Sequence, residues 1–174
     1  MAELYSDPGV RVETYRPEDA HDLADLFHAA VHGIEEMVYS ANEREAWAPT
    51  PPDYQWWQQR LNEMNPHVAW MGGELVGFAS VLITVKGHGE ESTREGHIDC
   101  LYVAPDCQRR GIALALFNRC LEQFLAAECI AMTVDASKLA QPFFRRQGFE
   151  VVAYNRVSLR GEHLFNCTMR RNLS

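Results

Sequence analysis

The stretch from Ile98 to Phe124 constrains the fold more than any other part of this chain. It opens with the apolar run 98–103, which predicts a strand, and continues through the short connection 104–110. After Gly111 the apolar residues recur at the spacing of one buried helical face, which predicts an amphipathic helix. The residues of that face are Ile112, Ala113, Leu116, Phe117, Cys120, Leu121 and Phe124.

The loop before this helix has the chemistry of a phosphate site. Backbone N–H groups in the first turn of a helix lack helical partners, and the helix dipole makes that end positive. Gly111 admits a ligand close to the backbone, and the small Ala113 leaves the first turn open. Arg109 and Arg110 add positive charge beside the same point. The loop therefore predicts a cradle for a pyrophosphate group, with an ordinary turn that binds nothing as the alternative.

Length and composition indicate one folded unit. At 174 residues with 47% hydrophobic side chains, the sequence predicts a single domain over 1–174. It has no apolar run long enough to span a bilayer and no signal-peptide core at its start. The five cysteines are odd in number and never form Cys-x-x-Cys, so neither a disulfide framework nor a zinc site is indicated. We expect a cytoplasmic protein.

The charge of the chain argues against binding to nucleic acid, because the net charge is −8. Residues 1–100 carry 18 acidic and 6 basic side chains, whereas residues 101–174 carry 6 acidic and 10 basic ones. The basic half contains the predicted phosphate cradle. Chance clustering of charges on solvated faces is the alternative explanation.

The remaining patterns predict a mixed sheet with helices on both faces, an α/β fold. Helices are expected after Pro17, after Ser40, over 54–64 and over 138–147, the last ending at Gly148. Strands are expected over 10–15, 67–71, 74–85, 98–103, 130–135, 149–159 and 164–170. The polar segment 86–96 is expected to be a loop.

Several motifs resemble the GCN5-related N-acetyltransferase (GNAT) superfamily. Gln108-x-x-Gly111-x-Ala113, following the run 101–103, is similar to its central Gln/Arg-x-x-Gly-x-Gly/Ala signature. The run 142–149 resembles its late helix and following strand, and segments 15–19, 133–137 and 155–161 are similar to its YafP-like branch. The resemblance implies the GNAT fold, acetyl-coenzyme A (acetyl-CoA) as the donor, and direct attack by an amine in a ternary complex.

The resemblance also implies roles for individual residues. His97 occupies the position of the general base, although a solvated residue at the start of a strand is the alternative. Asp99 could orient the His97 imidazole or hold the ammonium group of the acceptor. The pantetheine arm would pair with the backbone of Leu101 and Val103, where the sheet splays. The residues expected to contact the cofactor are Leu101, Tyr102, Val103, Gln108, Arg109, Arg110, Gly111, Ile112, Ala113, Ser137, Phe143 and Phe144.

Two positions depart from the family pattern. Phe144 stands where a tyrosine is often cast as the general acid, and Ser137 stands where an asparagine often contacts coenzyme A. Because Phe144 cannot donate a proton, water or a hydroxyl such as that of Tyr102 must protonate the leaving thiolate. These departures keep a second class of function open, a sensor or interaction module that binds acyl-CoA without turnover.

By the same resemblance, the acceptor site lies over the N-terminal helices. We expect His28, His32, Tyr39 and Trp47 to contact the acceptor, a primary amine of a small molecule or peptide. The acidic residues of this half favour a cationic acceptor. His28 and His32 are spaced to bind a metal, but no third ligand is spaced to complete the set, so we expect no metal. The sequence leaves open whether the chain is a monomer or a homodimer.

Overall fold

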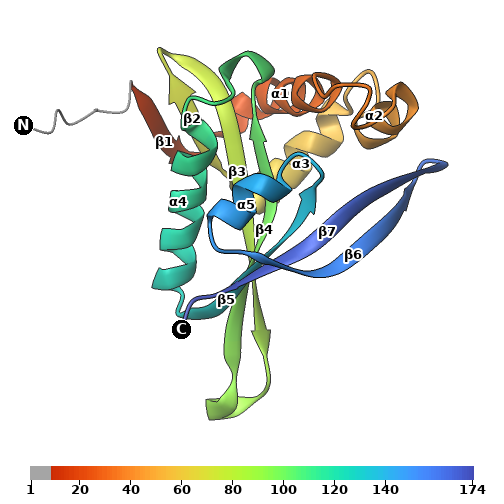
Figure 1. Cartoon of the computed structure of the whole chain (residues 1–174). Helices are drawn as coiled ribbons and strands as arrows, with labels where there is room; N and C mark the ends of the chain where they lie inside the picture. Colours follow the sequence, from red (N-terminus) through yellow and green to blue (C-terminus); the bar gives the residue numbers. More distant parts are fainter. Residues whose placement is uncertain (1–8) are drawn as a thin grey trace, which may run out of the picture.

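The computed structural model describes residues 9–174, which form a seven-stranded mixed sheet with helices packed against it (Figure 1). The strands are β1 (Val10–Thr14), β2 (His67–Met71), β3 (Glu74–Lys86), β4 (Thr93–Val103), β5 (Cys129–Ser137), β6 (Glu150–Leu159) and β7 (Glu162–Asn172). They lie in the order β1-β2-β3-β4-β5-β7-β6. Neighbouring strands are antiparallel except β4 and β5, which run parallel. The expected α/β fold with a mixed sheet is confirmed.

The α-helices of the described residues differ in how they begin, since only two of them have a side-chain cap. They are α1 (Ala20–His32), α2 (Ala41–Trp47), α3 (Tyr54–Met64), α4 (Ile112–Ala126) and α5 (Gln141–Arg146). Ser40 Oγ accepts a hydrogen bond from Glu43 N at the start of α2, and Asp53 Oδ1 accepts one from Trp56 N at the start of α3. Within residues 9–174, none of the helices combines the length and the apolar character needed to cross a bilayer.

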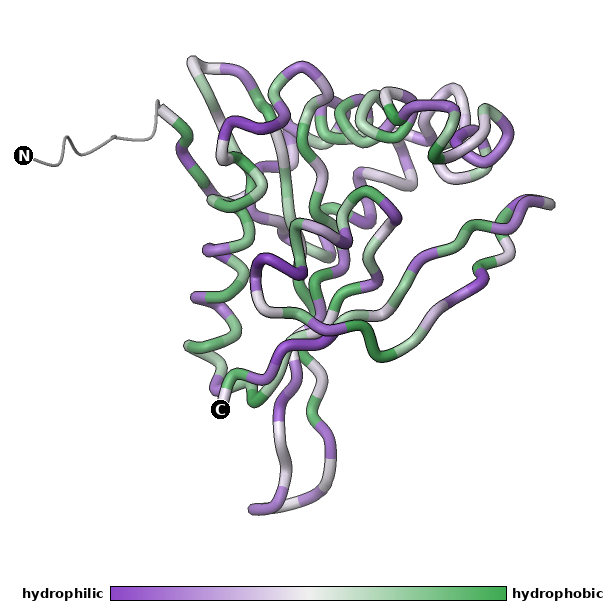
Figure 2. Tube along the Cα trace, viewed as in Figure 1, coloured by the Kyte–Doolittle hydropathy of each residue, from purple (hydrophilic) through white to green (hydrophobic). Residues whose placement is uncertain are grey.

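Two hydrophobic cores show that helices cover both faces of the sheet. One core joins α1 and α3 to the sheet and includes Leu23, Val31, Leu61, Val68 and Phe78. The other joins α4 and α5 to the opposite face and includes Ile98, Leu116, Phe124, Met132 and Phe144. Hydrophobic and hydrophilic residues alternate along α4, as expected for a helix with one buried face (Figure 2). The sheet therefore has a helical layer on each side.

The sheet splays between its two central strands (Figure 1). β4 pairs with β5 only from Arg94 to Ile98. Beyond that point, Cys100 to Val103 continue beside β3, whereas Asp135 to Ser137 continue beside β7. The backbone of β4 after Ile98 thus has no strand on its β5 side among the described residues. This is the splay in which the pantetheine arm was expected.

Two element boundaries differ from the sequence prediction. Thr93–Gly96, expected in a loop, is the beginning of β4 and pairs with β3. Its polar side chains are compatible with a strand because Glu95 forms ion pairs with Lys86 (2.7 Å) and Arg170 (3.0 Å). The helix expected over 138–147 is shorter, since Ala140 N donates to Ser137 O in a turn that precedes α5.

Candidate active site

The loop that enters α4 has the backbone geometry of an anion cradle. Arg109 (φ 63°) and Gly111 (φ 79°) both adopt the left-handed conformation, which is typical of tight anion-binding turns. Gly111 is the N-cap of α4, and no side chain of the described residues caps the first turn. Gln108, Arg109 and Arg110 are exposed beside it. Free N–H groups, a helix N-terminus and two guanidinium groups together fit a pyrophosphate.

The other expected cofactor residues of this region differ in what they can offer. Ile112 is only 1% exposed and packs in the core, so its side chain is unavailable and only its backbone N–H can bind a ligand. Leu101 and Val103 are half-buried and pack on the α4 side of the sheet, with their backbone at the splay. Ala113 is half-buried. These residues shape the cradle through the main chain.

A cavity of about 570 Å³ lies on the opposite face of the sheet, between the N-terminal helices, β4 and the β6–β7 turn. It is lined by Phe27, His28, Trp47, Ala48, Pro49, Pro51, Pro52, Asp53, Trp56, Trp57, Arg60, Asp99, Cys100, Tyr102, Leu159 and Arg160. The lining combines aromatic rings with two carboxylates and two guanidinium groups. The cavity therefore matches the region where the acceptor was expected, but its charges balance, so it does not repeat the acidic excess of residues 1–100.

His97 lies where β4 and β5 begin to diverge, and its imidazole contacts β5. His97 Nδ1 shares a hydrogen bond of 2.8 Å with Thr133 Oγ1, and Nε2 lies 3.9 Å from Asp135 Oδ2. Thr168 Oγ1 donates to the other oxygen of Asp135 at 2.6 Å, which holds that carboxylate in place. The imidazole is thus held between a hydroxyl and a carboxylate of β5.

Of the two roles expected for Asp99, orienting the His97 imidazole is not seen, since Asp99 pairs with Arg60 instead. Its Oδ2 accepts a hydrogen bond of 2.7 Å from Arg60 Nη2 and lines the cavity. The carboxylate beside His97 is instead Asp135, to which the sequence reading assigned no role. His97 pairs with Thr133 in the parallel ladder, and Asp135 lies two residues after Thr133 on the same face of β5. This strand pairing is the signal that could have identified Asp135.

Tyr102 belongs to the wall of the cavity. Its ring packs against Phe27 (4.9 Å between centroids) and Phe78 (5.6 Å), and the residue lines the cavity wall. Burial raises the pKa of the Tyr102 phenol, so the hydroxyl keeps its proton at neutral pH. Burial likewise raises the pKa of the neighbouring Cys100 thiol to about 11. Both groups are therefore neutral when a ligand enters.

Two residues expected to contact ligands belong to the protein interior. Phe144, expected at the cofactor, is 2% exposed and packs against Phe117, Phe143 and Phe149. Tyr39, expected at the acceptor, is 2% exposed; it donates to Phe165 O and accepts from Lys138 N, both at 3.1 Å. We therefore reassign these two side chains from ligand contacts to packing in the interior.

The rest of the expected set is divided among several surroundings. Phe143 is half-buried against Phe117, and Ser137 Oγ accepts a hydrogen bond from Ala140 N at 3.3 Å. His28 and Trp47 line the cavity as expected. His32 is outside the lining and its Nε2 donates to Ala48 O at 2.7 Å. Trp56 and Trp57, for which the sequence left core packing and a cation-holding wall as alternatives, also line the cavity. Arg60 lines it as well, although the sequence indicated no role for this residue.

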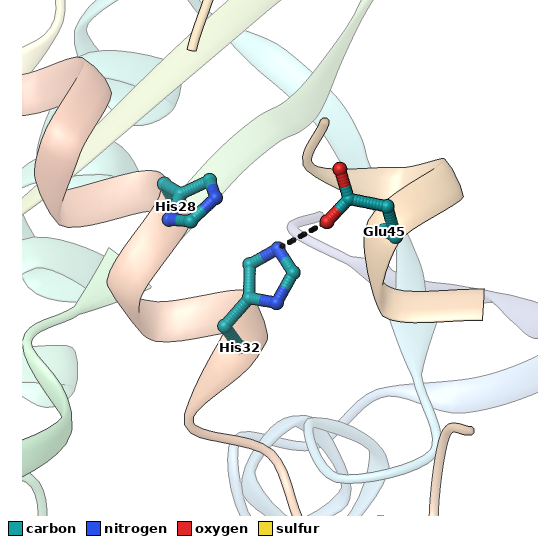
Figure 3. A group of neighbouring side chains, drawn as sticks. All are labelled: His28, His32 and Glu45. Carbon is teal, nitrogen blue, oxygen red and sulfur yellow. Dashed lines mark ion pairs between the residues drawn. The ribbon is translucent and has the colours of Figure 1, made fainter. Parts of the chain in front are cut away.

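The two histidines of α1 have a third ligand-type neighbour that the sequence reading did not anticipate. Glu45 of α2 lies beside His28 and His32, with Glu45 Oε2 3.6 Å from His32 Nε2 (Figure 3). The statement that no third ligand completes the set was therefore wrong. Glu45 lies on the next helix, so its spacing from the pair in the sequence is not that of ligands on one helix. The turn between α1 and α2 brings it close to the two histidines.

Comparisons with known proteins agree with this geometry. Residues 35–170 match the family model described as "Acetyltransferase (GNAT) domain". The chain is 34% identical over 161 residues to the uncharacterized N-acetyltransferase YafP of Escherichia coli strain K12, covering 92% of this chain and 95% of that protein.

Solved structures give the same result. A GCN5-related N-acetyltransferase from Rhodopseudomonas palustris superposes with a TM-score of 0.81 and 33% identity, covering 95% of this chain and 96% of the other. A GNAT superfamily phosphinothricin acetyltransferase from Sinorhizobium meliloti, in complex with acetyl-CoA, has the same fold with a TM-score of 0.68, 17% identity, and coverage of 95% and 89%. The family match, the relative at 34% identity and the shared fold show that the chain is an acyltransferase and belongs to the GNAT acetyltransferase family.

Proposed function

We propose that the protein transfers an acetyl group from acetyl-CoA to a primary amine of a small molecule or peptide, by direct attack within a ternary complex. The observation that carries the proposal is the position of β4 between two sites. On one face of the sheet, Asp99 and Tyr102 line the cavity. The same strand leads directly into the cradle at Arg109 and Gly111. A donor in the cradle and an acceptor in the cavity would meet along the splay.

The donor supplies an acetyl thioester when it is bound. The backbone N–H groups around Gly111, with Arg109 and Arg110, hold its pyrophosphate. The backbone of Leu101 and Val103 orients the pantetheine arm, since that edge of β4 has no strand beside it within the described residues. Ordering the donor in this way places its reactive carbon near the acceptor cavity.

The acceptor amine must lose a proton before or during attack. His97 takes that proton, directly or through one water, and Asp135 stabilises the resulting positive charge. Water or the hydroxyl of Tyr102, a residue of the cavity lining, gives a proton to the leaving thiolate. The aromatic walls formed by Trp47 and Trp57 hold the acceptor in place.

A second candidate function is binding of acyl-CoA without turnover, as a sensor or interaction module. Phe144 favours it, since the position where relatives often carry a tyrosine acid is a phenylalanine in the core. The two candidates share the cradle and differ in catalysis. Binding of the donor alone therefore does not distinguish them.

A coupled thiol-release assay distinguishes the two functions. The chain is mixed with acetyl-CoA and a panel of primary amines that includes polyamines, aminoglycosides, amino acids and lysine peptides. Thiol release that saturates with one amine and yields its acetylated product by mass spectrometry supports transfer. Tight binding of acetyl-CoA by calorimetry without turnover of any amine favours the sensor.

Three further expectations belong to this proposal. We propose that residues 1–174 form one domain, that the protein acts in the cytoplasm, and that no metal takes part in acetyl transfer. Size-exclusion chromatography with light scattering decides between a monomer and a homodimer. Assays with and without a chelator test whether transfer needs a metal.

A further inference from the structure

Three ligand-type side chains converge beside the acceptor cavity (Figure 3). His28 and His32 lie one turn apart on α1, and their rings stack with centroids 4.1 Å apart. Glu45 reaches them from α2, with Oε2 3.6 Å from His32 Nε2. One ligand atom from each of the three residues lies within 4.8 Å of the other two.

The packing of α2 against the end of α1 holds Glu45 in this position. Arg44 Nη1 donates hydrogen bonds of 2.9 Å to His32 O and to Ile34 O, which fixes α2 against the chain that leaves α1. The Glu45 carboxylate accepts hydrogen bonds from Thr50 N (2.6 Å) and Thr50 Oγ1 (2.9 Å). Groups outside the histidine pair thus orient the carboxylate. Metal ligands in proteins are usually oriented by such supporting contacts.

We propose that His28, His32 and Glu45 bind a divalent cation of the zinc class, with three protein ligands and one open coordination position. Two imidazole nitrogens and one carboxylate oxygen form a ligand set that zinc accepts in proteins. Magnesium and calcium are disfavoured, because they take oxygen ligands almost alone. Zinc bonds of about 2.0–2.2 Å require ligand atoms about 3.4 Å apart. Since the three ligand atoms lie within 4.8 Å of one another, side-chain rotations must draw them together by up to about 1.4 Å.

Each proposed ligand nitrogen has a partner that a metal would replace. In the metal-free arrangement His32 Nε2 donates to Ala48 O, and His28 Nε2 lies 2.7 Å from Thr50 Oγ1. Coordination through Nε2 moves the ring proton to Nδ1 and releases these contacts.

The cation would join α1 to α2 at the rim of the cavity, because His28 and Ala48 also line it. The site is separate from the cradle proposed for the donor, although His28 also lines the cavity, and binding of a cation needs no acetyl transfer. Its existence can therefore be tested by binding alone, and the result does not affect the proposed function.

The experiment titrates Zn²⁺ into the chelator-treated full chain by calorimetry and follows thermal unfolding with and without Zn²⁺. We expect one Zn²⁺ per chain, with a dissociation constant in the micromolar range or tighter, and a higher melting temperature with metal. Glu45→Gln and His28→Ala each weaken binding at least tenfold and remove the thermal shift. His32→Gln does the same while its amide can still donate to Ala48 O, so loss of binding there is not loss of folding.

Two matched controls remove the same side-chain types elsewhere. Glu43→Gln makes the same charge change on α2, and His163→Ala removes an exposed histidine at the β6–β7 hairpin. Both should bind Zn²⁺ like the unmodified chain. Should any ligand variant fail to fold, the d–d absorption of Co²⁺ bound to the unmodified chain reports whether a tetrahedral nitrogen and oxygen site exists. Absence of one-to-one binding, or binding that survives in all three ligand variants, overturns the proposal.

Discussion

At the scale of single residues, the site depends on which partner each polar side chain of β4 contacts. His97 and Asp99 share β4 but have different partners: His97 contacts Thr133 and Asp135, whereas Asp99 contacts Arg60. An imidazole beside a fixed carboxylate suits proton transfer. A carboxylate already paired with a guanidinium suits the wall of a binding cavity. The two residues therefore have separate tasks in the proposed reaction.

His97→Ala tests the proton acceptor. We expect kcat to fall on the order of a hundredfold, the lower range for positioned proton transfer. The affinity for acetyl-CoA should hardly change, because the cradle lies further along the chain. The pH profile of kcat should also differ between the two proteins, since the variant lacks the proposed proton acceptor. Asp135→Asn should lower kcat in the same direction, since it removes the charge that stabilises protonated His97.

Steady-state kinetics over a pH series checks this prediction. Asp22→Asn, on the exposed side of α1, is the control for the loss of one carboxylate. A His97→Ala protein with unchanged kcat and an unchanged pH profile would show that the imidazole only fills space. The amine would then lose its proton to water.

Tyr102→Phe tests the proton donor. The phenyl ring preserves the packing against Phe27 and Phe78, so the change removes only the hydroxyl. We expect kcat to fall on the order of a hundredfold while the dissociation constant of acetyl-CoA stays the same. Tyr154→Phe removes the hydroxyl of a tyrosine on β6 that is 80% exposed, and it should leave kcat unchanged. Equal kcat in the two variants would assign protonation of the thiolate to water.

At the scale of elements, the N-terminus of α4 concentrates the donor site in one turn. Gly111→Glu places a side chain and a negative charge where the pyrophosphate is proposed to meet the backbone. We expect binding of acetyl-CoA to be lost in calorimetry while the circular dichroism spectrum is retained. Gly89→Glu is the matched control, because Gly89 also has a positive φ (62°) and open space around it, in the turn between β3 and β4. Unchanged affinity in Gly111→Glu would place the cofactor elsewhere.

Elements with a clear local signal could be predicted from sequence, and the sites that depend on distant contacts could not. The helix over 54–64 has the predicted bounds because Asp53 caps its start, and Gly148 has the left-handed φ of 84° expected after the late helix. The splay, the cradle and the cavity follow from the family pattern. Tyr39 was misassigned because its partners, Phe165 and Lys138, lie far along the chain. No local pattern reports such contacts.

At the scale of the whole molecule, Glu95 connects three strands of the sheet. It lies on β4, and its carboxylate pairs with Arg170 of β7 and Lys86 of β3. β4 and β7 are not neighbours, since β5 lies between them. The pairs therefore span the central strands and hold the C-terminal strand near the point from which the splay opens. The segment that the sequence predicted as a loop thus contributes to the integrity of the sheet.

Glu95→Gln should lower the free energy of unfolding by about 1 kcal/mol at pH 7, because Glu95 is 14% exposed and accepts charge-assisted hydrogen bonds. The hydrogen bond from Arg170, followed by that from Lys86, lowers the pKa of Glu95 in the folded chain. A lowered folded pKa gives stability that is present above the unfolded pKa and is lost as pH falls through the folded pKa. The difference between the two proteins should therefore be largest near neutral pH and shrink below about pH 4. Urea unfolding at a series of pH values measures this difference in the free energy of unfolding, and Glu90→Gln, at an exposed position, is the control. A difference that does not vary with pH would show that the carboxylate charge has no part in holding the strands together.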